Sequence, residues 1–263
     1  MAKRISEFLQ RAYVILCLVF IFCPILTLTV FSFNVDRFPS LPWRGFTLSW
    51  YTALLEDSTI ADAFKNTLVV GASVAIVSTF LGFTGAYLDF RWNFFWKRLY
   101  LAVVVLPPTL PFLILGLALL LFLSRMGLGS SLIAVFISHV VICTPFALAI
   151  TRMRLAEMDQ GLEEAAWNLG ASEWRSAIEV ILPFTAPAIL ASALITMAVS
   201  FDEFMIAWFV SGLDQTLPVK ILVLLQGQVS PRINAIGTIV FTISFTLVAI
   251  AQIIILLTRR GAT

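Results

Sequence analysis

Charge is scarce in this sequence, and its scarcity limits what the chain can be. Only 12% of the 263 residues are charged, whereas 60% are hydrophobic, and the mean hydropathy is +0.99. A water-soluble domain has roughly a quarter of its residues charged. The composition therefore excludes an ordinary soluble domain and indicates that lipid surrounds much of the chain.

Several residue patterns that carry chemistry are also missing. The 17 basic and 15 acidic residues nearly cancel to a net charge of +2, which argues against nucleic acid as a partner. Cys17, Cys23 and Cys143 lie in apolar runs without metal-site or disulfide spacing, and we interpret them as small buried hydrophobic residues. No glycine-rich phosphate loop followed by Lys and Ser or Thr occurs, so ATP chemistry has to come from another chain. We expect neither a catalytic residue nor a metal or other cofactor here.

Long apolar runs are what the sequence has instead. A helix needs about 20 apolar residues to cross the hydrocarbon core of a bilayer. Five runs are long enough, and a sixth, at 186–210, is interrupted by two adjacent acids. The first run is too long for a signal-peptide core and has no cleavage pattern after it, so we expect it to remain as an anchor. The sequence predicts an all-α membrane protein of about six transmembrane helices, with the uninterrupted runs at 12–33, 67–88, 99–123, 132–150 and 235–257.

The basic residues indicate which side of the membrane each loop faces. Six spans place both termini on one side, and that side holds 11 of the 17 basic residues. Cytoplasmic loops carry the excess of Lys and Arg, so both termini and the loop at 151–184 are predicted to be cytoplasmic. That loop has six acids against three bases and is therefore oriented by its neighbours. The 11 residues are Lys3, Arg4, Arg11, Arg91, Lys97, Arg98, Arg152, Arg154, Arg175, Arg259 and Arg260.

Two runs carry a small residue at every fourth position, a spacing that lets helix backbones approach closely. We interpret both stripes as helix packing and leave open a role along a transport path, more so for the second. Prolines inside three of the runs predict kinked helices. The stripes are Ser78, Gly82 and Ala86, and Ala188, Ser192, Thr196 and Ser200; the prolines are Pro24, Pro107, Pro108, Pro111 and Pro145.

The cytoplasmic loop has the periodicity of two short helices. Four apolar residues fall at the i, i+3, i+4 and i+7 positions of one helical face, and Gly170 then supplies a residue that can end the helix in the left-handed conformation. Ser172 is a suitable cap for a second helix, and Pro183 is expected to break the chain before the next span. The two apolar faces are Leu162, Ala165, Ala166 and Leu169, and Trp174, Ala177, Ile178 and Ile181.

The first of these helices is suited to lie in a groove of another protein. The methyl side chains of Ala165 and Ala166 allow close approach, and Glu163 and Glu164 beside them can meet basic or amide partners. An interfacial helix that only links two spans has the same pattern. The pattern alone therefore leaves both interpretations open.

The same stretch resembles the signature of ABC importer permeases. That signature reads Glu-Ala-Ala, three residues, Gly, nine residues, then Ile-x-Leu-Pro, and the chain departs from it only at Val180, which keeps a β-branched apolar side chain. The resemblance implies a coupling helix, seated in a cleft of an ATPase, that includes Glu163 and Leu169. The matching residues are Glu164, Ala165, Ala166, Gly170, Leu182 and Pro183.

A wider resemblance covers the chain from about Phe46 to its end. It is similar there to the second permease of the spermidine and putrescine importers, a subgroup that also carries other small organic solutes, including amino-acid-like amines. The segments that carry this likeness are 46–51, 66–68, 200–204, 209–212, 216–219 and 231–235.

The resemblance implies an architecture and a set of partners. The fold would be that of a type I ABC importer permease, with an anchor helix and first exterior loop at 1–60, a permease core at 61–258 and a cytoplasmic tail at 259–263. The chain would lie in the bacterial inner membrane beside a second, related permease. ATP and Mg²⁺ would be bound by an ATPase dimer, and a solute-binding protein would deliver the solute from outside.

Asp202 and Glu203 are candidates for the transport path. A carboxylate inside a span costs at least a few kcal/mol unless it faces water, a partner or a cation. Glu203 continues the helix side that carries Ser200 and Thr196, and Asp202 projects beside it. We hypothesise that at least one acid lines the translocation cavity and gives it a potential that favours a polycation. The alternative is a structural pair that bonds a partner subunit or freed backbone groups.

Two other classes of protein compete with this hypothesis. A secondary carrier would need broken helices at corresponding positions of two halves, which the sequence does not show. An intramembrane enzyme would need a nucleophile with a base or a ligand cluster, and one histidine with two adjacent acids is little material. We interpret His139 as hydrogen-bonded between helices, with a proton relay as the alternative.

Overall fold

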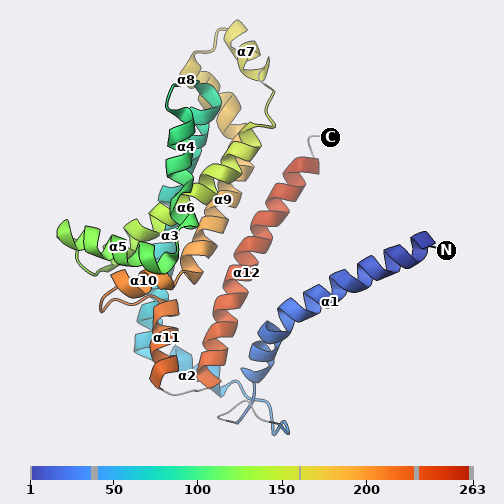
Figure 1. Ribbon diagram of the computed structural model, residues 1–263, viewed down its shortest axis with the longest axis vertical. Helices are drawn as coiled ribbons and strands as arrows, with labels where there is room; N and C mark the ends of the chain where they lie inside the picture. Colours follow the sequence, from blue (N-terminus) through green and yellow to red (C-terminus); the bar gives the residue numbers. More distant parts are fainter. Residues whose placement is uncertain (1, 37–40, 160, 228–230, 261–263) are drawn as a thin grey trace. The chain divides into compact units, whose positions relative to one another are not determined.

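The computed structural model describes residues 2–36, 41–159, 161–227 and 231–260, and the regular elements in these ranges are helices (Figure 1). Five of them are long and apolar enough to cross a membrane. The predicted all-α membrane fold is confirmed. The five are built on α1 (Ala2–Phe31), α3 (Ser58–Arg91), α6 (Leu132–Leu155), α9 (Leu182–Asp202) and α12 (Pro231–Arg260).

The run at 99–123 was expected to form one kinked helix, and this prediction is wrong. The chain forms α4 (Lys97–Val105), the 3₁₀ turn η1 (Pro107–Thr109) and α5 (Phe112–Arg125). Three prolines within five residues remove backbone donors and crowd the preceding carbonyls, so the helix ends instead of bending. By contrast, single prolines remain inside α1 and α6.

The interrupted run at 186–210 also differs from a single span. Its helix α9 ends at Asp202, Glu203 is extended with φ −69° and ψ 119°, and α10 (Met205–Val210) begins after Phe204. The break therefore falls at the two acids that the sequence placed inside the span.

Pro183 does not break the chain as expected. The short helix α8 (Glu173–Ser176) continues through the π-helical segment η2 (Ala177–Ile181) into α9, where Pro183 lies in the first turn. Proline lacks a backbone donor and crowds the carbonyl of the preceding turn. The wider turn of a π-helix accommodates both effects without separating the two helices.

The chain divides into two compact units. The first comprises Met1–Ala61 and Ile221–Thr242, and the second comprises Asp62–Lys220 and Ile243–Thr263. Helix α12 contributes to both and continues through Arg260, so the expected tail at 259–263 begins inside this helix, and its last three residues lie outside the described ranges.

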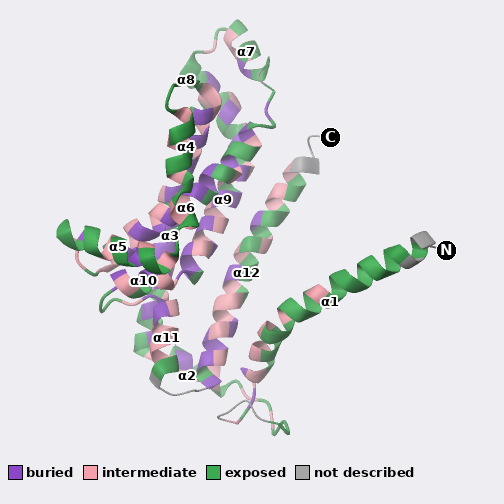
Figure 2. Ribbon diagram, in the orientation of Figure 1, coloured by how far each residue is buried: buried purple, intermediate pink, exposed green. Residues whose placement is uncertain are grey.

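In the first unit, the segment that follows α1 folds onto α2 (Ser49–Leu55). The indole of Trp50 donates to the carbonyl of Asn34 at 2.7 Å, and the ring of Phe33 stacks on Phe46 and on Tyr51 at centroid distances of 4.9 and 5.3 Å. The most apolar window of α1 is 0% buried, and most of its surface is exposed (Figure 2). Such a helix needs lipid or a partner around it.

In the second unit, α3, α6 and α9 pack through small residues. A Cβ added at Gly82 would lie 2.5 Å from the Cβ of Ala147, so α3 and α6 touch at backbone distance. Ser192 and Thr196 of α9 are fully buried, and Cys143 of α6 lies 3.7 Å from the carbonyl of Thr196. Residues of both predicted stripes thus lie at contacts between packed helices.

Candidate functional site

The signature loop forms a short helix, α7 (Gly161–Asn168), with a defined end. Gly170 has φ +86°, the left-handed conformation expected from the sequence. Its amide donates to the carbonyl of Trp167 at 2.8 Å, and the amide of Ala171 donates to Ala166 at 3.0 Å. These two bonds make a Schellman motif, so the glycine of the signature is a helix terminator. Ser172 caps α8 as predicted, accepting from the amide of Arg175 at 3.3 Å.

Helix α7 has one face turned to the chain and one turned away. Glu163 is only 6% exposed and Trp167 is half-buried, one helical turn apart. The predicted apolar stripe lies largely on the outer surface: Leu162, Ala165 and Leu169 are exposed, Leu169 to 89%, together with Glu164, and Ala166 is half-buried.

Arg91 holds the inner face of α7, a role that the sequence did not reveal. Its Nε lies 3.5 Å from Oε1 of Glu163, and its Nη2 lies 3.5 Å from Oε1 of Glu173 at the start of α8. The guanidinium carbon is 4.6 Å from the ring centre of Trp167, a cation–π contact. The residues are far apart in sequence and share no spacing, so no local pattern could have connected them.

The ends of the loop are buried in one hydrophobic cluster. Met158, before α7, and Ile181, after α8, pack with Ala86 of α3 and with α6. Val180, the one departure from the signature, packs against the same cluster, which explains why an apolar side chain suffices there. Leu182 and Pro183 lie exposed in the first turn of α9.

Glu203 is built into the helix break. It is 6% exposed, and its two carboxylate oxygens accept from the amides of Ile206 and Ala207 at 2.9 and 3.0 Å, which caps α10. Nε2 of His139 lies 3.2 Å from the same carboxylate, and Nδ1 of His139 lies 2.9 Å from the hydroxyl of Ser200. His139 is therefore hydrogen-bonded between helices, as the sequence indicated.

Of the four candidates for the transport path, the structure places only Asp202 in the open. Thr196 and Ser200 are buried against α6, and Glu203 is bound as described. Asp202 is exposed and accepts from the hydroxyl of Ser244 at 2.8 Å. It borders an open recess of about 460 Å³, lined by Phe112, Ala198, Val199, Asp202, Glu203, Phe204, Met205 and Val248.

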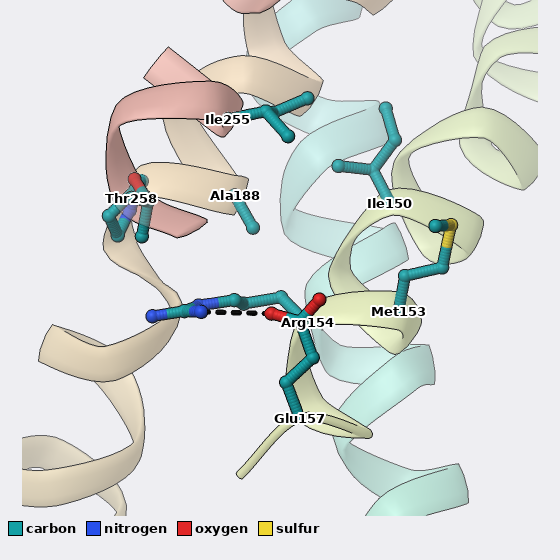
Figure 3. Close-up of a pocket in the computed structure, with 8 residues that line it drawn as sticks. Ile150, Met153, Arg154, Glu157, Ala188, Ile255 and Thr258 are labelled. Carbon is teal, nitrogen blue, oxygen red and sulfur yellow. Dashed lines mark hydrogen bonds and ion pairs between the residues drawn. The ribbon is translucent and has the colours of Figure 1, made fainter. Parts of the chain in front are cut away.

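A smaller cavity of about 80 Å³ lies between α6, α9 and α12 (Figure 3). Its charged groups bond each other and the backbone: Arg154 donates to Glu157 at 3.0 Å and to the carbonyl of Phe184 at 3.2 Å. The rest of its lining is mostly apolar. In the described part of the chain, no group of three or more potential ligands is placed to hold a metal ion.

Comparison with known proteins assigns the chain to a class. Residues 78–260 match the family described as "Binding-protein-dependent transport system inner membrane component". This match covers more than half of the chain, and the chain belongs to that family. It is a multi-pass membrane component of a binding-protein-dependent transport system.

Individual relatives are similar over nearly the whole chain. The spermidine/putrescine transport system permease protein PotC of Haemophilus influenzae is 29% identical over 94% of this chain and 96% of its own length. The putrescine transport system permease protein PotI of Escherichia coli is 30% identical over 84% of this chain and 81% of its own. In structure, the chain resembles a bacterial alginate ABC transporter solved in complex with an alginate-bound periplasmic protein. The TM-score is 0.68 at 16% sequence identity, and the match covers 97% of this chain and 92% of that one.

Proposed function

We propose that the chain is the permease subunit of an ATP-driven importer of polyamines, with spermidine and putrescine as its solutes. The observation that carries the solute class is the identity of 29–30% to PotC and PotI, whose names state those solutes. The same importer class with another small amine, such as an amino-acid-like one, is the alternative. An ion-driven carrier is less well supported because the signature loop would have no function in it.

The outer face of α7 is the proposed docking surface for the ATPase. Ala165 leaves room for close approach, while Leu162 and Leu169 are exposed large apolar side chains on the same helix. A short amphipathic helix of this kind binds in a groove. Glu164 is exposed beside them and can pair with a basic residue of the groove. ATP and Mg²⁺ bind to the ATPase dimer, which lies on the cytoplasmic side with both termini of this chain.

Transport then follows from movement of the coupling loops. ATP binding closes the ATPase dimer, brings the α7 helices of the two permeases together and opens the cavity outward to the binding protein. Hydrolysis resets the cavity to face inward. Such rigid-body rearrangements use packed elements with two stable arrangements.

Asp202 is the proposed contact for the cationic solute. Its carboxylate borders a recess with the aromatic residues Phe112 and Phe204, and both carboxylates and aromatic faces attract ammonium groups. Glu203 supports it indirectly, because the break that Glu203 caps places Asp202 at the end of α9. Thr196 and Ser200 serve the packing of this helix.

The proposal is tested by reconstituting the chain with its second permease, the ATPase and the binding protein in proteoliposomes. Labelled spermidine added outside should accumulate in the vesicles only when ATP is enclosed in the lumen, which the ATPase faces, and the binding protein is present outside. Uptake driven by an ion gradient without ATP would contradict the importer. ATP-dependent uptake of an amino acid but not of spermidine or putrescine would retain the importer and replace the solute.

A further inference from the structure

Helix α7 is joined to the rest of the chain by a charged contact in a largely buried position. The side chain of Glu163 is 7% exposed, and that of Arg91 is 23% exposed. Oε1 of Glu163 has the ion pair with Arg91 and no hydrogen bond among the described residues. A buried carboxylate without a compensating charge is costly, so Glu163 depends on Arg91 to stay on the inner face of α7.

Arg91 uses its guanidinium in three directions at once. One edge faces Glu163, another faces Glu173, and the flat face lies over Trp167. The side chain of Glu173 is largely exposed, so its ion pair with Arg91 stabilises the loop less than the pair with Glu163 does. A planar, delocalised cation can make all three contacts together, whereas the point charge of a lysine cannot.

The helix that carries Arg91 is held firmly to the transmembrane part of its unit. Arg91 is the last residue of α3, which meets α6 at Gly82 and Ala147. Two residues before Arg91, Asp89 accepts from Nε of Arg152 of α6 at 2.6 Å, and its Oδ1 lies 3.3 Å from Nζ of Lys97. A displacement of Arg91 therefore displaces α3 and α6 as a packed pair.

Resting on the proposed docking of α7 on an ATPase, we propose that Arg91 is a positioning residue that clamps α7 to the end of α3. Through this clamp, movement of α7 reaches α3 directly and does not depend only on the two chain connections of the loop. Arg91 lies on the inner face and does not contact the ATPase. Its loss therefore uncouples ATP hydrolysis from transport without removing the ATPase.

The test uses the complete complex with binding protein, and it compares Arg91→Ala, Glu163→Ala and the double variant. Each single variant should retain the ATPase on purification, while stimulation of ATP hydrolysis by loaded binding protein falls by at least about fivefold, the lower range of a coupling between sites. The double variant should lose no more than Arg91→Ala alone, because Glu163→Ala removes only a contact that Arg91→Ala has already removed. Exchanging the charges, Arg91→Glu with Glu163→Arg, should recover part of the stimulation.

Two matched controls separate this clamp from the docking itself. Arg98→Ala removes an exposed arginine of α4 on the same side and should leave stimulation unchanged. Glu164→Gln changes the outer face of α7 and should weaken retention of the ATPase, which tests the proposed function independently of Arg91. If Arg91→Ala fails to assemble, Arg91→Lys takes its place, with partial stimulation expected.

Several results would overturn the clamp. The clamp is contradicted if Arg91→Ala, or Arg91→Lys in its place, keeps the stimulation of ATP hydrolysis seen in the unaltered complex. It is also contradicted if the fold-losses of stimulation in the two single variants multiply in the double variant. Loss of the ATPase in Arg91→Ala that the charge exchange does not repair would show that Arg91 acts on docking or folding instead. Failure of the unaltered complex to retain an ATPase would refute the proposed function, and that result appears before any variant is made.

Discussion

Among single residues, Glu203 and Asp202 show how two adjacent acids take different roles. Glu203 is enclosed by two backbone amides and His139, so its charge is satisfied by the fold. Asp202 accepts a hydrogen bond from Ser244 and borders a recess. The sequence predicted that the two side chains diverge because adjacent residues point about 100° apart on a helix. In the structure they diverge because Glu203 is extended after the last residue of α9. Which acid turns inward depends on His139 of another helix and could not be read from the sequence.

Glu203→Gln is expected to destabilise the protein more than Asp202→Asn. An amide keeps one acceptor, but its NH₂ group faces a backbone donor at the start of α10. We expect the free energy of unfolding to fall by about 1.5–3 kcal/mol, the range for hydrogen bonds to charged groups. Thermal unfolding of the purified protein in detergent measures it. If Glu203→Gln keeps its stability but loses uptake, Glu203 contacts the solute and is not only a structural group.

Asp202→Asn is expected to reduce uptake while leaving stability close to that of the unaltered protein. Removing the charge of the proposed contact with an ammonium group should lower polyamine uptake by at least about tenfold, since a charged hydrogen bond is worth about 1.5–3 kcal/mol. Uptake of labelled spermidine at matched amounts of assembled complex is the measurement. Asp62→Asn, an exposed acid at the start of α3, is the control. Full uptake in Asp202→Asn would exclude it from solute contact.

Among elements, periodicity predicted the helices and small-residue stripes predicted their contacts, but the breaks were less predictable. The sequence showed Pro107, Pro108 and Pro111, and we expected a kink where the helix in fact ends. Whether a helix with several prolines stays continuous depends on whether neighbouring helices bond the freed backbone groups, and a sequence does not show that packing. Pro183 shows the opposite outcome, because a π-helical turn before it keeps the helix continuous. A single proline therefore gives a weaker signal for a helix end than a cluster does.

The contact of α3 with α6 leads to a prediction with an internal control. Gly82→Ala places a Cβ 2.5 Å from that of Ala147 and 2.6 Å from the backbone nitrogen of Leu148, so the helices must separate. Overpacking of this kind costs about 1–3 kcal/mol, and Ala147→Gly should recover part of it. At Gly71 of the same helix the added Cβ meets Met197 at 3.7 Å, an ordinary contact. Gly71→Ala should be neutral or stabilising by up to about 1 kcal/mol. Equal thermal unfolding of the two variants would contradict the close approach.

For the whole molecule, the sequence was most informative about class and least informative about internal connections. The composition gave a membrane protein and the signature loop gave its family, because both are properties of contiguous residues. The contact of Arg91 with Glu163 joins the end of one helix to a loop that is distant in the sequence. In the sequence, Arg91 only follows an apolar run and Glu163 only precedes the signature, and nothing connects the two. Long-range charge pairs carry no period, so they require the fold.

Orientation is the property of the whole molecule on which the proposal depends, and labelling can measure it. Cys17, Cys23 and Cys143 are first replaced by Ala or Ser, and Leu169→Cys then places a thiol at a site that is 89% exposed. An impermeant maleimide should label it in inside-out vesicles and not in intact cells, and adding the ATPase should protect it. Leu213→Cys, at a fully exposed position on the predicted exterior side, should react only from outside. Labelling of position 169 from outside would place α7 away from any ATPase, because nucleotide-driven subunits lie in the cytoplasm, and the coupling role would then be refuted.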